Sequence, residues 1–336
     1  MPGMQSRFIF LIMIAMTFPA CSSPKKDVPP PDHVIVQLKW KHQAQFSGFY
    51  VAEEKGYYRN ENIAVQFLEG GSDIDCASAL ISTQAQFAVI APEDVLIKRG
   101  ENYPLLAIGV IYRRSAVVFI SHGDSGIVRP SDFKGKTIAT LGAGGAVRDF
   151  ELQFKAMMTH LDIDMTTISL VPYDPEYKGF IDGSVDVTAS YLTGGVILLE
   201  KQGRALNLIW PGDYGVNFYS DTIVTTREMT EQKPDLVFRF LKATLKGWRD
   251  AVGGPANAVD ITMKYAEVKD RKLQTAMTDA MLPLVNTGED QIGWMKGDDW
   301  HGMVNLLLNQ NIIPATIPDT DDYYTMTFLK KIYGNN

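Results

Sequence analysis

The sequence lacks the features that mark several common protein classes. It has only two cysteines in 336 residues, Cys21 and Cys76, so neither a disulfide framework nor a cysteine-based zinc site fits. Its five histidines are scattered without the spacing of metal ligands. No interior run reaches the ~18 apolar residues of a membrane span, and the GxSxG motif of serine hydrolases is missing.

Positive charge is also scarce. The 32 Lys and Arg residues are outnumbered by 39 Asp and Glu residues, which gives a formal net charge of −7. Nucleic-acid binders usually carry a basic face, and no Lys/Arg cluster here indicates one. Because 46% of the residues are hydrophobic and 21% are charged, we expect a large core rather than disorder. The length suggests two domains, or one fold with two lobes.

The first 20 residues have the pattern of an export signal. Arg7 is the only charged residue among them, and Phe8 to Met16 form an unbroken apolar run. A basic start, a short apolar stretch and a small residue are typical of a secretory signal peptide. The run is about half as long as a spanning helix requires. We therefore predict a signal peptide over residues 1–20.

Cys21 follows this segment directly. Ala20-Cys21-Ser22-Ser23 resembles the cleavage site of a bacterial lipoprotein, in which the cysteine thiol is lipidated. Simple secretion is the alternative. One lipid chain binds a membrane only marginally, and stable anchoring needs a second signal. The several lipid chains of bacterial lipoproteins would supply it. We predict a lipidation site and a Pro-rich, extended linker over residues 21–32, which would anchor the protein to a membrane.

From His33 onward the sequence alternates between strand and helix patterns. The first half predicts strands over residues 33–40, 63–68, 87–91 and 105–111. The second half predicts strands over residues 137–141, 185–190, 206–210 and 222–226 and a helix over residues 146–160. Such alternation favours parallel sheets with helices on both faces, hence an α/β fold.

Two α/β units with a return crossing describe two lobes around a cleft. We assign residues 33–117 and 222–336 to lobe 1 and residues 118–221 to lobe 2, joined by two hinge crossovers. In α/β sheets, ligands bind beyond the carboxyl ends of the strands, at loops that open helices. These loops cover residues 40–48, 70–73, 91–94, 142–146 and 191–195.

Several stretches, in order along the chain, resemble the NMT1/THI5-like (SsuA/THI5-like) substrate-binding proteins of ABC importers. They are LKWKHQAQFSGFYVAEEKGYYRNENIAVQF, APEDVLIKRG, SDFKGKTIAT, FIDGSVDVT and WPGDYGVNFYSDTIVTTREM, followed by PDLVFRFLKATLKGW. The ordered series covers nearly all of residues 34–330, and it is more specific than any single motif in it.

The resemblance implies a type II periplasmic-binding-protein fold, in which each lobe is a doubly wound sheet flanked by helices. It also implies a monomeric binding protein in the periplasm or at the cell surface that serves an ABC permease and its ATPase. The ligand would be a small heteroaromatic nutrient, above all a thiamine pyrimidine precursor. Riboflavin, a sulfonate or nitrate are the alternatives within this class, and a sensor input domain is another class.

One branch of the family is an enzyme that makes the thiamine pyrimidine from its own histidine and bound pyridoxal phosphate. The lysine that holds its cofactor would align with Ile90, and its active-site histidine with Asp94. Its cysteine-rich iron site would fall on residues 216–220, which contain no cysteine. A Schiff base requires a lysine amine. The resemblance therefore implies no catalytic residue, cofactor or metal, although a thiamine pyrimidine synthase remains the alternative.

The residues themselves suggest a site for a flat ligand. Its ring face requires aromatic stacking, and its edge requires a carboxylate or amide that accepts from N–H groups. Gly144 and Gly145 open a helix and would offer backbone N–H groups to an anion or carbonyl. The candidate ligand-binding residues are Trp40, Gln45, Phe46, Glu93, Gly144, Gly145, Tyr191 and Asp221.

Each candidate has a structural alternative. Trp40 fits a core position, Glu93 fits a helix start whose dipole favours an acid, and Asp221 fits a cap. Weaker candidates are His42, Gln43, Tyr50, Asp94, Tyr214 and Tyr219. Arg113 and Arg114 lie near the first crossover and fit a hinge salt bridge, whereas Cys76 fits a buried free thiol.

Overall fold

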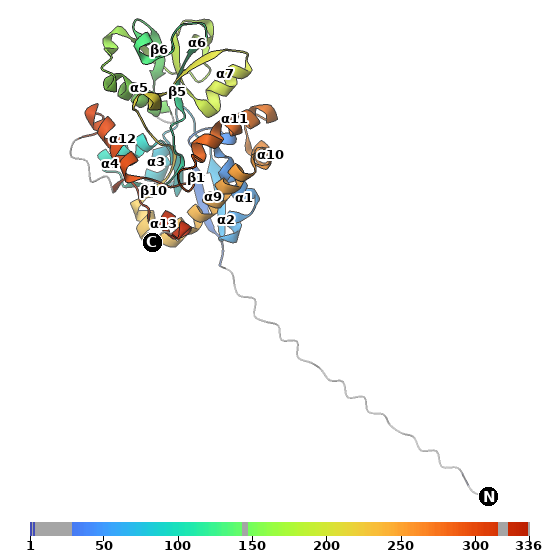
Figure 1. Ribbon diagram of the computed structural model, residues 1–336. Helices are drawn as coiled ribbons and strands as arrows, with labels where there is room; N and C mark the ends of the chain where they lie inside the picture. The colour runs from blue at the N-terminus through green and yellow to red at the C-terminus, as the bar shows by residue number, and fades with distance from the viewer. Residues whose placement is uncertain (2, 4–28, 143–146, 315–321, 335–336) are drawn as a thin grey trace. The chain divides into compact units, whose positions relative to one another are not determined.

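The structure is a computed structural model that describes residues 1, 3, 29–142, 147–314 and 322–334. Residues 2 and 4–20 of the predicted signal peptide, Cys21, Gly144 and Gly145 lie outside the described residues. Contacts divide the chain into Met1–Pro30 and Pro31–Asn336. The fold described below is that of the second unit (Figure 1).

The first sheet has the strand order β2-β1-β3-β10-β4. Its strands are β1 (Asp32–Gln37), β2 (Ile63–Leu68), β3 (Phe87–Ile90), β4 (Leu105–Tyr112) and β10 (Ser220–Thr226). Every residue of β3 and β4 is buried, as expected for apolar strands covered on both faces, and the outer edge of β4 is covered by bridges to Gly293 and Tyr324. β1 pairs in parallel with β2 and β3, but β10 runs antiparallel between β3 and β4.

The second sheet has the order β7-β6-β8-β5-β9. Its strands are β5 (Val117–His122), β6 (Thr137–Leu141), β7 (Ser169–Pro172), β8 (Val187–Tyr191) and β9 (Leu206–Ile209). β6 is parallel to β7 and β8, whereas β5 runs antiparallel between β8 and β9. The expectation of purely parallel sheets is therefore wrong in both sheets.

The crossovers explain the two antiparallel strands. The chain leaves the first sheet at Tyr112 and reaches β5 at Val117, and it returns between Ile209 and Ser220. A strand reached directly from the other sheet enters at the edge where its parallel neighbours end, so it must run against them. The two lobes joined by two crossovers were predicted, and Figure 1 shows the middle of the chain, green to yellow, in one lobe and both flanking parts in the other.

Helices cover both sheets. In the lobe of the first sheet they are α1 (Ser47–Glu54), α2 (Tyr57–Asn60), α3 (Cys76–Ile81), α4 (Pro92–Gly100), α8 (Arg227–Gln232), α9 (Pro234–Gly253), α10 (Pro255–Tyr265), α11 (Arg271–Val285), α12 (Gly297–Asn309) and α13 (Thr327–Tyr333). In the other lobe they are α5 (Arg148–His160), α6 (Lys178–Asp182) and α7 (Ile197–Lys201), which follows the π-helical turn η5 (Leu192–Val196). Shorter 3-10 turns are η1 (Ala44–Phe46), η2 (Pro130–Phe133), η4 (Met165–Thr167) and η6 (Pro211–Tyr214).

α9 is an amphipathic helix of the core. Pro234 occupies its first turn, where the missing N–H costs nothing. Its apolar stripe is buried, and it packs closely on α1 because Gly48 faces the ring of Trp248. This packing fixes the helix that follows Gln45, and so helps to position one wall of the cleft.

Candidate functional site

The loops that leave the strand ends meet between the lobes and enclose a pocket of about 100 Å³. The first lobe contributes Lys39, Trp40, Gln43 and Gln45, which follow β1. The second lobe contributes Phe150, Tyr173, Pro175, Tyr177, Tyr191, Gly194, Gly195 and Leu198. This position agrees with the rule that ligands bind beyond the carboxyl ends of strands in α/β sheets.

Aromatic rings make up much of the pocket wall. Trp40 is half-buried on one side, and Phe150, Tyr173, Tyr177 and Tyr191 form the other. The rings of Phe150 and Tyr173 meet edge to face with centroids 4.9 Å apart. The Tyr173 hydroxyl donates to that of Tyr177 at 3.1 Å. Such a pocket suits a flat ring that stacks on one side chain and meets the edges of others.

Tyr177 of the pocket wall has a strained backbone conformation. Its φ of 57° lies in the left-handed region, which is uncommon for a bulky residue. The Tyr177 hydroxyl and Ser190 Oγ are 3.0 Å apart, and a Cβ added to Gly195 would lie 1.8 Å from that hydroxyl. Only a glycine at position 195 lets the hydroxyl approach this turn.

A buried ion pair lies at the edge of the pocket and joins the lobes. Lys39 Nζ is 2.6 Å from Asp149 Oδ2, and the two side chains are 4% and 1% exposed. Burial alone would lower the pKa of Lys39, but the carboxylates of Asp149 and Asp221 outweigh it and raise that pKa. The amine is therefore held as a cation. It also lies 3.3 Å from the Tyr191 hydroxyl.

Asp221 connects the lobes at the start of β10. Gln45 Nε2 donates to Asp221 Oδ2 at 2.7 Å, and the Tyr191 hydroxyl donates to Oδ1 at 2.9 Å. Because Gln45 belongs to the first lobe and Tyr191 to the second, this carboxylate holds both walls of the pocket. Burial raises the pKa of Asp221, and Lys39 and the two hydrogen bonds oppose that rise.

Glu93 lies deeper between the lobes, at the start of α4. Gln153 of α5 donates to Glu93 Oε1 at 2.8 Å, whereas Glu93 Oε2 and Asp149 Oδ1 are buried without a hydrogen-bond partner in the described part of the chain. Burial, and next the charge of Asp149, raises the pKa of Glu93 to about 8. Asp94 faces Arg148 at 3.5 Å, and burial raises its pKa to about 7.

We call four of these interlobe contacts the latch: Lys39–Asp149, Gln153–Glu93, Tyr191–Asp221 and Arg148–Asp94. It places four carboxyl groups against two cations. Two carboxylate oxygens in it have no partner among the described residues, and leaving such a buried acceptor unpaired is costly.

The structure places the predicted site residues in three groups. Trp40, Gln45 and Tyr191 line the pocket, and Glu93 and Asp221 lie in the contacts between the lobes. Phe46 neither lines the pocket nor joins the lobes, because its side chain, at the end of η1, is wholly buried in the core. Gly144 and Gly145 lie outside the described residues.

The weaker candidates also separate. Gln43 lines the pocket, and Asp94 belongs to the latch. Tyr50 is a core residue whose hydroxyl contacts His42 Nδ1 at 2.8 Å, and burial lowers the pKa of that histidine. Cys76 is the buried free thiol that we expected, and burial raises its pKa to about 12.

Sequence reasoning missed several residues of the site. Lys39 and Asp149 carry its central ion pair, Gln153 pairs with Glu93, and Phe150, Tyr173 and Tyr177 form much of the aromatic wall. One signal for Lys39 was present, since a lysine in the strand-like run HVIVQLKW has few ways to reach solvent. The aromatic residues of the second lobe follow no pattern that distinguishes them from core residues.

The described residues form neither a metal-ligand cluster nor a membrane-spanning helix. They contain no group of three or more His, Cys, Asp or Glu side chains arranged to hold a metal ion. Within the same residues, no helix combines the length and the apolar character needed to cross a membrane.

The family model described as "NMT1/THI5 like" matches residues 43–258. The chain belongs to this family. Several curated proteins are similar to it over much of their length. A riboflavin-binding protein, RibY, of Chloroflexus aurantiacus is 23% identical over 95% of this chain and 96% of its own. A formylaminopyrimidine-binding protein of Halalkalibacterium halodurans is 23% identical over 88% of this chain and 95% of its own length.

Other NMT1/THI5-like relatives carry the name of an enzyme. A 4-amino-5-hydroxymethyl-2-methylpyrimidine phosphate synthase of Legionella pneumophila is 23% identical over 68% of this chain and 72% of its own. The family therefore includes proteins named for binding and proteins named for synthesis.

Solved structures establish the fold of this NMT1/THI5-like chain. The ligand-binding component of an ABC-type import system from Staphylococcus aureus superposes with a TM-score of 0.69 at 12% identity, covering 90% of this chain and 99% of that one. The periplasmic aliphatic sulphonate binding protein SsuA from Escherichia coli gives 0.67 at 13% identity, over 85% and 90%. The predicted two-lobed periplasmic-binding-protein fold is confirmed.

Proposed function

We propose that this chain is the extracytoplasmic solute-binding protein of an ABC importer and that its ligand is a thiamine pyrimidine precursor. The observation that carries the proposal is the pocket of about 100 Å³ between aromatic rings, next to buried carboxylates. Drug-sized ligands occupy pockets of about 300–1,000 Å³. The pocket therefore favours one heteroaromatic ring over a three-ring flavin.

The charge of the ligand distinguishes an aminopyrimidine from a sulfonate or nitrate. Lys39 is the only charged side chain among the described residues that line the pocket, and its amine is already paired with Asp149 and attracted by Asp221, so a sulfonate or nitrate would find no free cation there. An aminopyrimidine brings N–H donors, which Asp149 Oδ1, an acceptor without a partner among the described residues, would accept. The name of the Halalkalibacterium halodurans relative supports this choice, and that of the Chloroflexus aurantiacus relative keeps riboflavin as the alternative.

The residues argue against a pyrimidine synthase. The position expected to carry the cofactor lysine is Ile90, a buried core residue. Lys39 is the lysine of the pocket, but its amine is held as a cation by Asp149. A lysine that forms a Schiff base must lose its proton, so Lys39 is poorly suited to replace it.

The N-terminal sequence supports the location that we propose. The export signal over residues 1–20 and a lipid on Cys21 would hold the protein in the periplasm or at the cell surface, on the outer side of a membrane. There a monomer with two lobes would deliver ligand to a permease and its ATPase. Closure of two lobes around a ligand is an established motion of binding proteins.

A thermal-shift panel tests the function. It contains 4-amino-5-aminomethyl- and 4-amino-5-hydroxymethyl-2-methylpyrimidine, thiamine, riboflavin, taurine and nitrate. A ligand at 100 times its dissociation constant stabilises by about 2.7 kcal/mol, which is readily measured. We expect a shift with the pyrimidines alone, reduced in Trp40→Ala. A shift with riboflavin or taurine alone would show that the ligand is not a pyrimidine precursor. The absence of a shift with every compound would overturn the proposal.

A further inference from the structure

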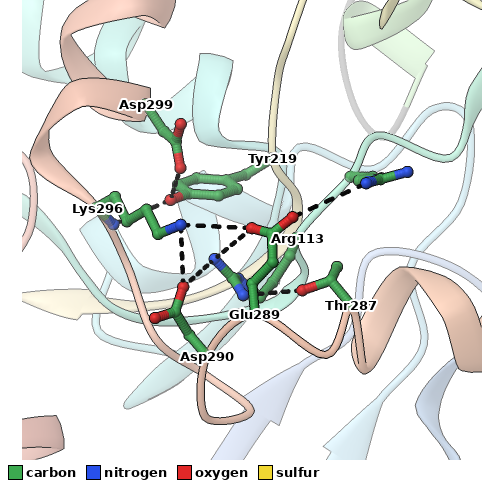
Figure 2. A network of polar contacts seen from close by, with 8 residues as sticks. Arg113, Tyr219, Thr287, Glu289, Asp290, Lys296 and Asp299 are labelled. Atoms are coloured by element: carbon green, nitrogen blue, oxygen red, sulfur yellow. Dashed lines mark hydrogen bonds and ion pairs between the residues drawn. The ribbon is translucent and has the colours of Figure 1, made fainter.

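Both crossovers between the lobes are attached to one segment of the first lobe. This segment, residues 287–299, connects α11 to α12 and includes the first turn of α12; we call it the hinge strap (Figure 2). It lies away from the ligand pocket, and among the described residues none lines both the pocket and the cavity beside the strap.

Arg113 attaches the first crossover, immediately after β4. Its side chain is 3% exposed, and its Nη2 donates to Asp290 Oδ2 at 2.7 Å. Its Nη1 donates to Thr287 Oγ1 at 2.9 Å, and its backbone N–H donates to Leu284 O at 2.9 Å. The predicted hinge salt bridge is thus confirmed for Arg113. A charge-assisted hydrogen bond of this kind is roughly twice as strong as one between neutral groups.

Tyr219 attaches the second crossover, immediately before β10. Its hydroxyl donates to the carboxylate of Asp299 and accepts from the backbone N–H of Lys296 at 3.0 Å. Its ring meets Trp300 edge to face. Lys296 Nζ lies 3.1 Å from Asp290, so the attachments of the two crossovers are joined in one network (Figure 2).

A cavity of about 390 Å³ lies between the crossovers and the strap. Ser115, Trp210 and Asn217 of the crossovers line it, together with Glu289 and Lys296 of the strap. Arg114 and Ser115 of the first crossover and Asn217 of the second, which lie beyond the two attachments, therefore border this cavity, whereas Ala116, Val216 and Phe218 are buried. The cavity gives the bordering residues space in which to change their backbone angles, which a fully packed core would not.

We propose that the hinge strap sets the pivot of lobe rotation, confining the bend to residues 114–116 and 210–218. Arg113 and Tyr219 are positioning residues in this device. Detaching one of them lengthens the flexible hinge and gives the open state more arrangements, whereas the latch still fixes the closed state. The closed population then falls, and the apparent dissociation constant rises by the same factor.

Pulsed electron paramagnetic resonance on the ligand-free full chain tests this device. Spin labels at Asn60→Cys and Lys134→Cys report the distance between the lobes, and both positions are exposed. Cys21→Ser removes one native thiol, and the other, Cys76, is buried away from the label. Tyr219→Phe and Asp290→Asn should broaden the distance distribution and move it to longer distances. Tyr57→Phe is the matched control, because that hydroxyl also donates to a carboxylate, Asp250, but far from the crossovers.

Binding of 4-amino-5-hydroxymethyl-2-methylpyrimidine gives a second readout. Its dissociation constant should rise about 2- to 10-fold in Tyr219→Phe, the size of effect expected from a coupling residue that does not touch the ligand. A distance distribution that is unchanged in Tyr219→Phe, or equally broadened in Tyr57→Phe, overturns the device. If Tyr219→Phe does not fold, Asp299→Asn weakens the same contact by replacing the carboxylate that accepts from Tyr219 with a neutral amide. The distance measurement requires no ligand, so failure of the pyrimidine to bind would overturn only the proposed function.

Discussion

Glu93 joins the two lobes through Gln153, and the protonation of its carboxyl group contributes to the pH dependence of stability. Its pKa of about 8 lies above its ordinary value of 4.5, so between these pH values the folded protein holds a proton that the unfolded chain releases. This contribution is fully present below pH 4.5 and is lost as the pH rises through 8. We expect the free energy of unfolding to fall over that window, by at most about 1.4 kcal/mol per pH unit.

Glu93→Gln is the variant that checks this expectation. The amide keeps the shape of the side chain and carries no titrating proton, so the slope between pH 5 and 8 should flatten. Denaturant unfolding at four pH values measures it. Asp132→Asn is the control, because the carboxyl of Asp132 is partly exposed in a capping contact of the second lobe and its pKa is lowered. An unchanged slope in Glu93→Gln would show that Glu93 stays ionised.

Single residues also show how far sequence reasoning reaches into the site. Trp40, Gln45 and Tyr191 could be placed at the pocket because each lies beside the end of a predicted strand. Lys39 could not, because a buried lysine is tolerated only next to its counter-charge, Asp149, which lies 110 residues further along the chain. The inward position of Phe46 depends on the short turn η1, which has no strong sequence signal.

At the scale of elements, the π-helical turn η5 shapes the second-lobe wall of the pocket. π-helical turns are rare and occur frequently at functional sites. Here the turn carries two adjacent glycines with different surroundings. A Cβ at Gly195 would overlap the Tyr177 hydroxyl at 1.8 Å, whereas one at Gly194 would meet nothing closer than 3.8 Å. The pair therefore provides a matched experiment on one turn.

We predict that Gly195→Ala abolishes most ligand binding and that Gly194→Ala retains it. The added methyl must push Tyr177 from its contact with Ser190 and into the pocket, and overpacking of this kind typically costs about 1–3 kcal/mol. The corresponding loss of affinity is roughly 5- to 150-fold. Isothermal titration with the ligand identified in the thermal-shift panel measures it. Equal affinities for the two variants would contradict the proposed role of this turn.

The strands themselves were largely predictable, since β2 and β6 coincide with the expected ranges 63–68 and 137–141. Their direction was not. Local alternation of apolar and polar residues shows that a segment is a strand, but it does not show from which edge the chain enters the sheet. For β5 and β10 that edge is set by the crossovers, which are contacts between distant parts of the chain.

At the scale of the whole fold, the latch and the hinge strap act at different positions between the two sheets. The latch joins the lobes beside the pocket, near the ends of β1, β3 and β8, whereas the strap holds the crossovers beside β4 and β10. Opening the cleft would break the latch contacts and hydrate their charges. The strap, which lies within the first lobe apart from the crossovers, would stay in place.

This difference gives a prediction for Asp149→Asn. Removing one partner of a buried ion pair costs about 3–5 kcal/mol if the other charge stays buried. Here the molecule can avoid that cost by opening, which returns Lys39 to water without unfolding either lobe. We therefore expect a shift toward longer interlobe distances and at least a 10-fold weaker ligand affinity, with a change of less than about 1 kcal/mol in the free energy of unfolding.

Lys55→Gln is the control for Asp149→Asn, because Lys55 pairs with Asp250 at the same 2.6 Å but within one lobe. That pair is half-exposed, and exposed pairs contribute about 0–1 kcal/mol. Its loss should leave both the interlobe distance and the affinity unchanged. If Asp149→Asn instead lowered the free energy of unfolding by several kcal/mol at an unchanged interlobe distance, the Lys39–Asp149 pair would be a part of the core. Lobe closure would then depend on the other latch contacts and on the ligand.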